Sequence, residues 1–438
     1  MRENNGILYD VIVIGAGAAG LMAAGTAAES GRRVLLLEKM EKAGRKIRIT
    51  GKGRCNVTNL APHEEFLRHV RWRDRFFRPA FEAFDNRATF DFFTGLGVRL
   101  GVERGERVFP ESGDAWEIAN ALVHWCEQNG VEIRYHSRVT GIDAEDDAIA
   151  GVRFEVEGKE EYIPCQNVIL CTGGVSYPAT GSTGDGYAFA DRLGHTVCEV
   201  RPSLVPLEYR LPAGTPPDGV ELRNVKVRLL VDGRPRGEEF GEMEFTASTV
   251  AGPVILRLSR NAVDALIEEK RVELAIDLKP AVTTEQLTAR IEREVAALPL
   301  GATVNDLLRK LLPKGMAPAM ATKIRVPRRA MIREMTPTRC ELLVNALKHF
   351  LLTVTDYRPF EEAIVTAGGI DVDDLDALTL ESRIVQGLYF AGEILDIDAD
   401  TGGYNLQIAF STGRMAGQLK GSGASANALE SSLPAEQP

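Results

Sequence analysis

The chain has 438 residues, of which 44% are hydrophobic and 26% charged, and its formal net charge at pH 7 is −10. This composition is typical of a soluble globular protein of two or three domains, and the negative charge argues against binding of the whole protein to nucleic acid or to an anionic membrane. Six scattered cysteines without a Cys-x-x-Cys pair give no metal or redox-disulfide signature. With no apolar run of membrane-spanning length and no signal-peptide pattern, we expect a cytoplasmic protein.

The first elements are typical of a βαβ unit that binds a dinucleotide. In chain order they are a strand at 10–14, a glycine-rich turn at 15–20, a helix at 21–30, a strand at 33–37 and an acid, Glu38, at its tip. The turn would place backbone N–H groups and the positive helix end against a pyrophosphate, and Glu38 would accept hydrogen bonds from an adenosine ribose. We therefore predict an ADP-containing cofactor on Gly15, Ala16, Gly17, Ala18, Ala19 and Gly20. The alternative is a βα turn that binds nothing.

A basic stretch follows this unit. From Arg32 to Arg54 the sequence holds nine Lys or Arg residues, against two acidic residues, Glu38 and Glu41. A solvated basic face is one interpretation. Because the stretch directly follows the phosphate-binding turn, we expect some of its cations, such as Lys39, to balance the pyrophosphate.

The segment at 50–59 is the second motif, and it reads Thr50-Gly51-Lys52-Gly53-Arg54-Cys55-Asn56-Val57-Thr58-Asn59. Gly51 and Gly53 would let backbone pack against a flat ring or a phosphate, and Arg54 and Asn56 supply hydrogen-bond donors. Cys55 is either a reactive thiol or a small residue that fits close to a ring. We favour the small residue, because no partner cysteine or histidine lies nearby in sequence.

Helical patterns cover 64–93 and 115–129, and strand patterns cover 131–156 and 168–171. Acidic residues share the aromatic-rich segment 64–93, so buried helix faces are favoured there over a nucleic-acid surface. The strand at 168–171 runs into Thr172, Gly173 and Gly174, and a glycine-rich loop then leads to a helix at 187–193. We expect Asp185 to cap this helix or to contact the cofactor.

After residue 196 the pattern changes to alternating β residues with a turn at Asp232-Gly233. Helices are predicted at 284–298 and 303–312. A basic run follows, which we interpret as a solvated face; its members are Lys323, Arg325, Arg328, Arg329 and Arg333.

From about residue 352 the sequence returns to strands and glycines, and the tail at 421–438 is expected to be disordered. One strand ends at Gly392-Glu393, where a carboxylate can reach ribose or ribityl hydroxyls. A helix rich in small residues, at 408–419, begins beyond Gly403 and can direct its positive end at a reduced flavin. A nicotinamide enzyme needs no such second element, so these segments favour FAD.

At this point the chain resembles the HI0933-like flavoproteins, a family with aminoacetone-oxidase-like and bile-acid-reductase-like members. The likeness covers nearly the whole chain and is most specific at 51–59, 180–186, 365–369 and 387–405. It implies an α/β, glutathione-reductase-type FAD-binding Rossmann-like domain, formed discontinuously by 1–195 and 350–420. Residues 196–349 would form an inserted β-barrel-like domain with a small helical part at about 280–335.

The resemblance also implies positions along FAD. Arg45 and Lys46 would lie along the ADP half, the backbone of Val139 would face adenine, and 51–56 would border the isoalloxazine ring near N5. Glu393 and Asp396 would reach the ribityl and phosphate region. The residues expected at the pyrimidine edge are Gly403, Asn405 and Leu406.

The chain departs from the family in the insert. Relatives often carry Phe-Thr-His-x-Gly-x-Ser-Gly-Pro, whereas this chain has Ala247 at the histidine position and Ala251 at the serine position. The departure puts substrate specificity or turnover in question, while the motifs for FAD are intact.

Together these features predict an FAD-dependent oxidoreductase that passes hydride between flavin N5 and a small organic substrate, in the manner of an amine oxidase or an enone reductase. The candidates for the required proton donor or acceptor are Tyr177, Arg54 and Tyr404, each of which also has a structural interpretation. Because no second dinucleotide motif follows, the flavin would be reduced by the substrate, by NAD(P)H that binds transiently, or by another protein. The alternatives are an FAD-containing RNA-modification or RNA-associated protein and a flavoprotein without turnover. No oligomeric state is predicted.

Overall fold

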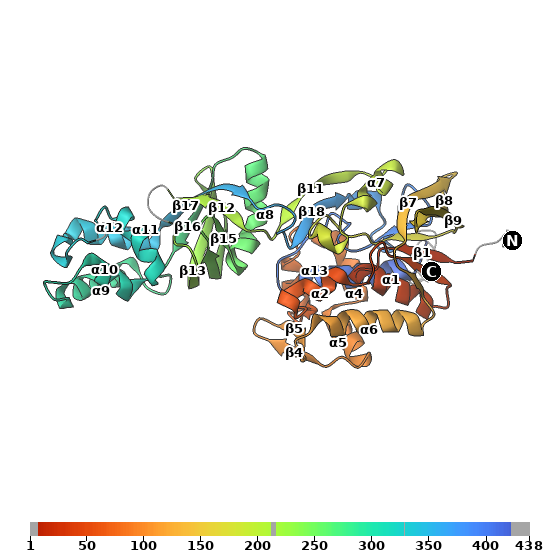
Figure 1. Cartoon of the computed structure of the whole chain (residues 1–438), viewed down its shortest axis with the longest axis horizontal. Coiled ribbons are helices and arrows are strands. Elements are labelled where there is room, and N and C mark those ends of the chain that lie inside the picture. Colours follow the sequence, from red (N-terminus) through yellow and green to blue (C-terminus); the bar gives the residue numbers. More distant parts are fainter. Residues whose placement is uncertain (1–7, 212–215, 328, 422–438) are drawn as a thin grey trace, which may run out of the picture. The chain divides into compact units, whose positions relative to one another are not determined.

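The computed structural model describes residues 8–211, 216–327 and 329–421. Arg328 and the tail predicted beyond residue 421 lie outside the described residues. The chain divides into two compact units, which we call the first unit (Met1–Arg201 with Val365–Pro438) and the inserted unit (Pro202–Ile364) (Figure 1). That each unit is an independent domain stays a prediction.

A five-stranded parallel sheet forms the centre of the first unit. Its strands are β1 (Val11–Ile14), β2 (Val34–Leu37), β6 (Glu132–Arg134), β10 (Val168–Leu170) and β19 (Leu388–Phe390), in the spatial order β19-β10-β1-β2-β6. Every neighbouring pair is parallel. All residues of β1, β2, β10 and β19 are buried, as expected for strands covered on both faces. The sheet confirms the predicted α/β fold.

Helix α1 (Ala18–Glu29), which is rich in small residues, packs on the sheet, α13 (Tyr404–Gly417) contacts β19, and α6 (Ala115–Gln128) packs on α1. Helices α1 and α13 lie so close together that a Cβ added to Gly413 would be 2.4 Å from the carbonyl oxygen of Ala19. Both helices begin a few residues before their predicted starts, at 18 and 404. The reason is that the carbonyls of Gly17 and Gly403 already accept the first hydrogen bonds of the helical pattern.

Smaller elements complete the first unit. Three short helices follow one another, α3 (His63–Arg68), α4 (Asp74–Ala83) and α5 (Asn86–Gly95). They bury Phe66, Phe77 and Phe93 completely, which confirms buried helix faces for the aromatic segment. Two antiparallel sheets contain β3 (Thr58–Asn59), β4 (Leu100–Glu103) and β5 (Arg107–Pro110), and β7 (Arg138–Glu145), β8 (Ala148–Val156) and β9 (Lys159–Pro164). Strands β11 (Val197–Ser203) and β18 (Val365–Ile370) pair with each other.

The inserted unit contains a closed barrel, which confirms the predicted β-barrel-like insert. Its strands are β12 (Leu207–Arg210), β13 (Val220–Val231), β14 (Arg234–Phe245), β15 (Thr249–Ala251), β16 (Val272–Asp277) and β17 (Phe350–Tyr357), in the order β12-β15-β14-β13-β16-β17. Strands β13 and β14 form the hairpin predicted at Asp232-Gly233. The assignment of residues from 350 onward to the FAD-binding part is wrong for β17, because this strand pairs with β16 and β12 and so closes the barrel.

Helices complete the inserted unit. Helix α8 (Pro253–Ile267) packs on the barrel, and a helical part contains α9 (Thr284–Ala297), α10 (Val304–Leu311), α11 (Ala317–Lys323) and α12 (Pro337–Lys348). The predicted helices at 284–298 and 303–312 correspond to α9 and α10. Each begins with a capping box, at Thr283 and Thr303, which is the sequence signal that makes these two starts predictable.

Candidate functional site

The carboxyl ends of four parallel strands bring the predicted cofactor residues to one edge of the sheet. Strand β1 runs into the turn at 15–20, β2 into Glu38, β10 into 172–174 and β19 into 391–393. Because every neighbouring pair is parallel, these segments leave the sheet on the same side. Ligands of open α/β sheets bind at this edge.

The glycines of the turn at 15–20 differ in the space around them. Gly15 has a φ of +97°, which favours glycine, and an added Cβ would lie 2.6 Å from the carbonyl oxygen of Cys171. An added Cβ at Gly20 would lie 1.8 Å from the carbonyl oxygen of Gly15. At Gly17, in contrast, an added Cβ meets no atom of the described chain within 4 Å. Gly15 and Gly20 are therefore required by the protein itself, while Gly17 leaves open space beside the start of α1.

Glu38 is held by the backbone around that turn. Its Oε2 accepts a hydrogen bond from the Ala16 N–H at 2.8 Å, and its Oε1 accepts one from the Met40 N–H at 2.8 Å. Each carboxylate oxygen has a second acceptor position, so a ribose hydroxyl would still find a partner. The Ser137 N–H donates to the carbonyl of Glu38, which places the start of β7, and with it the predicted adenine contact Val139, next to this acid.

Asp185 is the first residue of helix α7 (Asp185–Arg192), so the prediction that it caps this helix is wrong. The N-cap is Gly184, which has a left-handed backbone and no side chain. The carboxylate of Asp185 instead lies 2.6 Å from the ammonium of Lys39 and accepts a hydrogen bond from Thr183. Burial acts to raise the pKa of Asp185, but the hydrogen bond and charge of Lys39 outweigh it and lower that pKa below its ordinary value. The carboxylate of Asp185 therefore binds Lys39, which is distant in sequence, and does not cap the helix.

Lys46 and Glu393 join two distant segments at the sheet edge. Lys46 lies in helix α2 (Arg45–Gly53), and its Nζ is 2.6 and 2.9 Å from the two carboxylate oxygens of Glu393. One of these oxygens also accepts a hydrogen bond from the Thr366 N–H at 2.9 Å. The neighbouring Arg45 pairs with Glu41 and donates to a backbone carbonyl in the loop before α7. Of the two cations predicted along the ADP half, Lys46 therefore stands beside a predicted ribityl contact, whereas Arg45 binds Glu41 and the Ala179 carbonyl.

The motif at 50–59 interrupts α2, because Thr50, Gly51 and Lys52 have non-helical backbone angles. The side chain of Cys55 is fully buried, and burial raises the pKa of its thiol to about 12. A thiol that keeps its proton at neutral pH is a poor nucleophile, which supports the interpretation of Cys55 as a small packing residue. The guanidinium of Arg54 lies 4.4 Å from the centre of the Phe109 ring and pairs with Glu103. This candidate proton donor therefore has two structural partners.

The loop after β10 is tightly packed. An added Cβ at Gly174 would lie 2.3 Å from Oγ1 of Thr366, and that hydroxyl oxygen accepts a hydrogen bond from the Val175 N–H at 2.9 Å. Tyr177, a predicted proton donor, is half-buried and has a left-handed backbone, with a φ of +51°. Asp396, predicted near the ribityl chain, is buried and accepts a hydrogen bond from the indole nitrogen of Trp72 at 2.7 Å.

Helix α13 begins after Gly403, whose φ is +100°. The side chain of Asn405 is engaged with the preceding loop, since Oδ1 accepts from the Ala399 N–H at 3.0 Å and Nδ2 donates to the carbonyls of Ala399 and Asp400. Asn405 therefore shapes the loop, and its backbone is the part available to a ligand. Leu406 is half-buried.

A histidine that sequence reasoning did not connect with the site lies beside this helix start. The Nδ1 atom of His69 is 2.8 Å from an Asp400 carboxylate oxygen, and the imidazole stacks on the ring of Tyr404 with ring centres 4.4 Å apart. Asp400 is 2% exposed and also accepts a hydrogen bond from Arg71. The one available signal was the acidic alternation Asp396-x-Asp398-x-Asp400 just before the glycines; nothing near His69 in sequence pointed to it.

Several buried polar atoms at this edge fit a polar ligand. Among the residues that the structure describes, Arg45 Nε, Asn56 Oδ1 and Thr172 Oγ1 are buried and have no hydrogen-bond partner. The hydroxyl of Tyr187 shares this property, and burial, with the charges of Glu393 and Asp396, raises the pKa of Tyr187. Buried polar groups in native proteins nearly always have a partner. These atoms, together with the open space at Gly17, fit a dinucleotide that runs along the sheet edge.

The fold and this edge define an FAD-binding Rossmann-like protein with an inserted antiparallel barrel. Residues 9–419 match the family described as the HI0933-like protein Rossmann domain. The chain belongs to this family of flavoproteins and is an FAD-dependent oxidoreductase.

Two relatives match over most of their length. The chain is 33% identical over 408 residues to the 3-dehydro-bile acid delta(4,6)-reductase of Clostridium scindens, which covers 93% of this chain and 97% of the relative. It is 29% identical over 405 residues to the ribosomal RNA dihydrouridine synthase of Escherichia coli, which covers 92% of this chain and 96% of the relative. One relative is named as a reductase of a bile acid and the other as a synthase of dihydrouridine in ribosomal RNA.

Solved structures share the fold. A 3-ketosteroid delta1-dehydrogenase from Sterolibacterium denitrificans matches with a TM-score of 0.51 at 12% identity, over 94% of this chain and 98% of that chain. A quinol-fumarate reductase matches with a TM-score of 0.50 at 16% identity, over 98% of this chain and 72% of that chain. Within the described parts of the chain, no helix has the length and apolar character needed to cross a membrane.

Proposed function

We propose that this protein is an enone reductase: it transfers hydride from flavin N5 to a small organic substrate whose C=C bond is conjugated with a carbonyl group. The observation that carries the proposal is the His69–Asp400 pair, which lies against Tyr404 at the start of α13, the element proposed to face the flavin's pyrimidine edge. The similarity to a bile-acid reductase supports an enone over an amine.

The residues proposed to hold FAD follow the sheet edge. The backbone at 15–20 and the start of α1 would bind the pyrophosphate, Glu38 the adenosine ribose, and Lys46 with Glu393 the region between phosphate and ribityl chain. The start of α13 would direct its partial positive charge at the pyrimidine edge. Bound flavin supplies the hydride acceptor and donor at N5.

The remaining requirement is a proton. Reduction of an enone adds hydride to the β-carbon, and the electron pair of the C=C bond then takes a proton at the α-carbon. His69 is proposed as the donor, with Asp400 as the positioning residue, because an imidazole can donate a proton from a ring nitrogen and Asp400 fixes its orientation. Tyr404, Tyr177 and Arg54 stay weaker candidates; Arg54 is already paired with Glu103.

Anaerobic spectrophotometry tests the proposal. Purified protein supplied with FAD is expected to lose its oxidised-flavin absorbance with NADH or NADPH, which would bind transiently, and to regain it when a simple cyclic enone is added. A protein that takes up no flavin at all contradicts the FAD proposal. A reduced flavin that no enone reoxidises, although oxygen does, contradicts the enone proposal and favours an oxidase.

A second candidate function is reduction of uracil in RNA. The uracil C5=C6 bond is conjugated with the C4 carbonyl, so its reduction needs the same hydride and proton as an enone. The relative named as a ribosomal RNA dihydrouridine synthase supports it, and so does a concentration of eight Lys or Arg residues with one acid between 303 and 333. Dihydrouridine in transcribed ribosomal RNA, measured by mass spectrometry after incubation with reduced protein, is the discriminating readout.

A third candidate is a flavoprotein without turnover, suggested by the departures at Ala247 and Ala251. Ala247 is exposed in the turn between β14 and β15, and Ala251 is the last residue of β15. If Ala247→His increases enone turnover of an otherwise slow protein, the departure limits catalysis. If neither enone nor RNA is reduced by wild type or by Ala247→His, this third candidate is favoured.

A further inference from the structure

The helical part of the inserted unit carries a charge opposite to that of the whole chain. We call residues 303–333 the basic layer; they hold eight Lys or Arg residues and one acid, Asp306, in a chain of net charge −10. The layer includes helices α10 and α11. A local excess of cations in an acidic protein directs anionic partners to one surface.

Most cations of this layer are not neutralised by the protein. Five are exposed and have no ion pair with the described residues: Arg309, Lys314, Arg325, Arg329 and Arg333. Two other cations of the layer do have partners. Lys310 lies 2.8 Å from Glu294, and Lys323 donates to the carbonyl of Leu351 and lies over the Phe350 ring. The five unpaired cations repel one another in the free protein, and an anionic ligand would relieve that repulsion.

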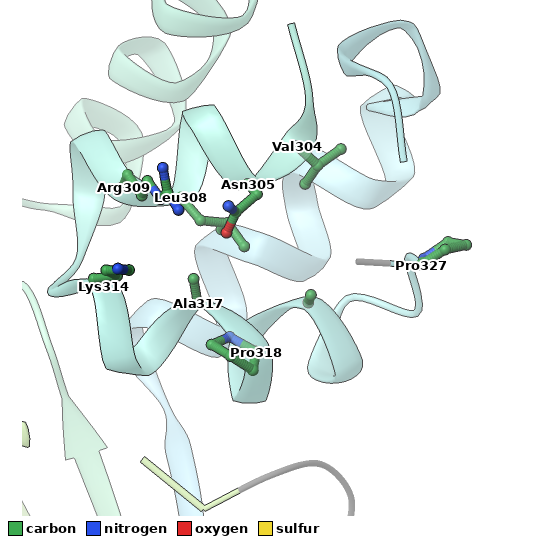
Figure 2. A pocket seen from close by; sticks show the side chains of 9 residues that line it. Val304, Asn305, Leu308, Arg309, Lys314, Ala317, Pro318 and Pro327 are labelled. Atoms are coloured by element: carbon green, nitrogen blue, oxygen red, sulfur yellow. The ribbon is translucent and has the colours of Figure 1, made fainter. Parts of the chain in front are cut away.

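Two of these cations, Arg309 and Lys314, line a pocket of about 230 Å³. Figure 2 shows Arg309 and Lys314 on one side of it and Pro327 on the other. Arg325 and Arg329 flank Pro327 in sequence, and the Val304 N–H donates to the carbonyl of Ala330, which holds the segment before Arg333 against the start of α10. Arg309 and Lys314 therefore line the hollow, while Arg325, Arg329 and Arg333 belong to the segment that contains or follows Pro327.

The lining of the pocket is mainly apolar. Its walls include Val304, Leu308, Ala317 and Ala321, and Asn305 adds one amide. The volume is below the roughly 300 Å³ at which pockets for drug-sized ligands begin. The chemistry that matches is a flat ring with hydrogen-bonding edges, linked to anionic groups on either side. A single nucleotide within a strand has this form.

An unpaired strand of RNA fits this surface better than a membrane does. Between 303 and 333, leaving out residue 328, no large hydrophobic side chain is exposed that could insert into a bilayer. Duplex nucleic acid keeps its bases stacked and paired, whereas RNA loops and bulges offer single bases next to phosphates. We infer that the basic layer binds single-stranded segments of RNA, with phosphates on the five cations and one base in the pocket. This inference deepens the second candidate function and rests on it for the role of RNA.

Fluorescence anisotropy with a labelled single-stranded RNA of about 12 nucleotides tests the inference. The test variant is Arg309→Gln with Lys314→Gln and Arg325→Gln. The matched control is Lys226→Gln with Arg228→Gln and Lys310→Gln, which also removes three charges from the inserted unit, but from cations paired with Glu238 and Glu294. The full-length, FAD-loaded protein is used, and each variant is checked for flavin content and melting temperature.

The test variant is expected to bind RNA at least about tenfold more weakly, and its slope of log affinity against log salt is expected to fall by about 2, since each lost contact with a single strand removes about 0.7. The control is expected to change both values much less. An abasic oligomer of the same length is expected to bind about tenfold more weakly, because it cannot fill the pocket. If the triple variant fails to fold, the three single variants are measured, each with an expected slope change of about 0.7.

The inference is overturned if the test variant binds RNA as wild type does, or if the control loses as much affinity. Equal affinity for DNA of the same sequence, or tighter binding to phosphatidylserine vesicles, overturns RNA as the partner. The experiments distinguish a failure of RNA binding from a failure of RNA reduction. RNA that binds but gains no dihydrouridine leaves the inference standing and contradicts the second candidate function. If the test variant reduces RNA with an unchanged KM, the inference is contradicted and the second candidate function stands.

Discussion

The Nδ1 atom of His69 lies 2.8 Å from Oδ2 of Asp400, although 331 residues separate the two in sequence. The contact is supported by a backbone bridge between Val70 and Ala399 and by the Asp400 N–H, which donates to the carbonyl of His69. A buried carboxylate on Nδ1 selects the tautomer and orientation of an imidazole, which is the arrangement that a proton-transferring histidine requires.

Replacing this histidine tests its role. His69→Gln is expected to lower enone reduction by about a hundredfold or more, because the variant lacks the proton donor. Its rate should also lose any pH dependence that this proton-transferring group gives to the wild type. Stopped-flow reoxidation of the reduced flavin at several pH values gives both results.

Asp400→Asn separates positioning from proton transfer. We expect a smaller loss, about 10- to 100-fold, with pH dependence retained, because the imidazole stays but is held less well. A His69→Gln protein that keeps a wild-type rate and pH profile contradicts the role of His69, and Tyr404→Phe is then the next variant to measure.

Alanine substitutions at Gly17 and Gly20, in the turn at 15–20, separate an effect on FAD binding from an effect on stability. Gly17→Ala is expected to leave the melting temperature unchanged, since its φ is −82° and its Cβ would meet no described atom within 4 Å, but to weaken FAD binding by about tenfold or more through contact with the pyrophosphate. Gly20→Ala would place its Cβ 1.8 Å from the carbonyl oxygen of Gly15. That variant is expected to lose about 1–3 kcal/mol of stability or more.

Differential scanning fluorimetry and titration of apo-protein with FAD distinguish the two glycine variants. A Gly17→Ala protein that binds FAD as wild type does would show that the cofactor phosphates lie elsewhere. Equal melting temperatures for Gly20→Ala and wild type would contradict the close approach of α1 to the turn.

The pair of Lys46 with Glu393 is expected to matter for cofactor retention. Lys46→Met removes the cation and leaves the partly buried carboxylate of Glu393 beside the cofactor's phosphates, so the Kd for FAD should rise by about tenfold or more. Lys42→Met is the control, because Lys42 is exposed, belongs to the same basic stretch and lies over the Trp116 ring. Isothermal titration of apo-protein with FAD measures the difference; equal Kd values for the two variants would remove Lys46 from the site.

Because the thiol of Cys55 is buried, we expect the stability of the protein to fall as the pH rises into the alkaline range. Burial raises the pKa of its thiol from 9.0 to about 12, so the folded protein keeps the proton where the unfolded chain loses it. Stability from this group is complete below pH 9 and is lost as the pH rises toward 12. At about pH 10 the loss is on the order of 1 kcal/mol.

Urea denaturation of wild type and Cys55→Ala between neutral and alkaline pH measures this loss. The difference in unfolding free energy between the two proteins should shrink as the pH rises above 9.0. A constant difference would mean that the thiol ionises equally in both states. Rapid labelling of Cys55 by a thiol reagent in the folded protein would contradict its burial.

Local sequence patterns are sufficient to predict the first βαβ unit and the starts of helices that carry capping signals. A continuous apolar run, three spaced glycines and a terminal acid act within about 30 residues of one another, so their spacing alone identifies the turn and its neighbours. Thr283 and Thr303 likewise mark the starts of α9 and α10 through hydrogen bonds to residues three positions later.

Two predictions were wrong because a contact with a segment distant in sequence outweighed a local preference. Asp185 has the chemistry of an N-cap, but the ammonium of Lys39 takes its carboxylate. Strand β17 follows the insert in sequence and looked like part of the FAD-binding sheet, yet its edges pair with β16 and β12. Neither Lys39 nor β16 is near enough in sequence to contribute to a local pattern.

The sequence by itself determined the family motifs, the order of strands and helices, and the presence of a nucleotide-binding turn, because these depend on residues a few positions apart. Only the tertiary structure decided that His69 meets Asp400, that Lys46 meets Glu393, and that two cations of the basic layer, Arg309 and Lys314, line one pocket. Each of these arrangements depends on packing between segments, and the free energy that selects it comes from the buried core as a whole and not from the residues that meet.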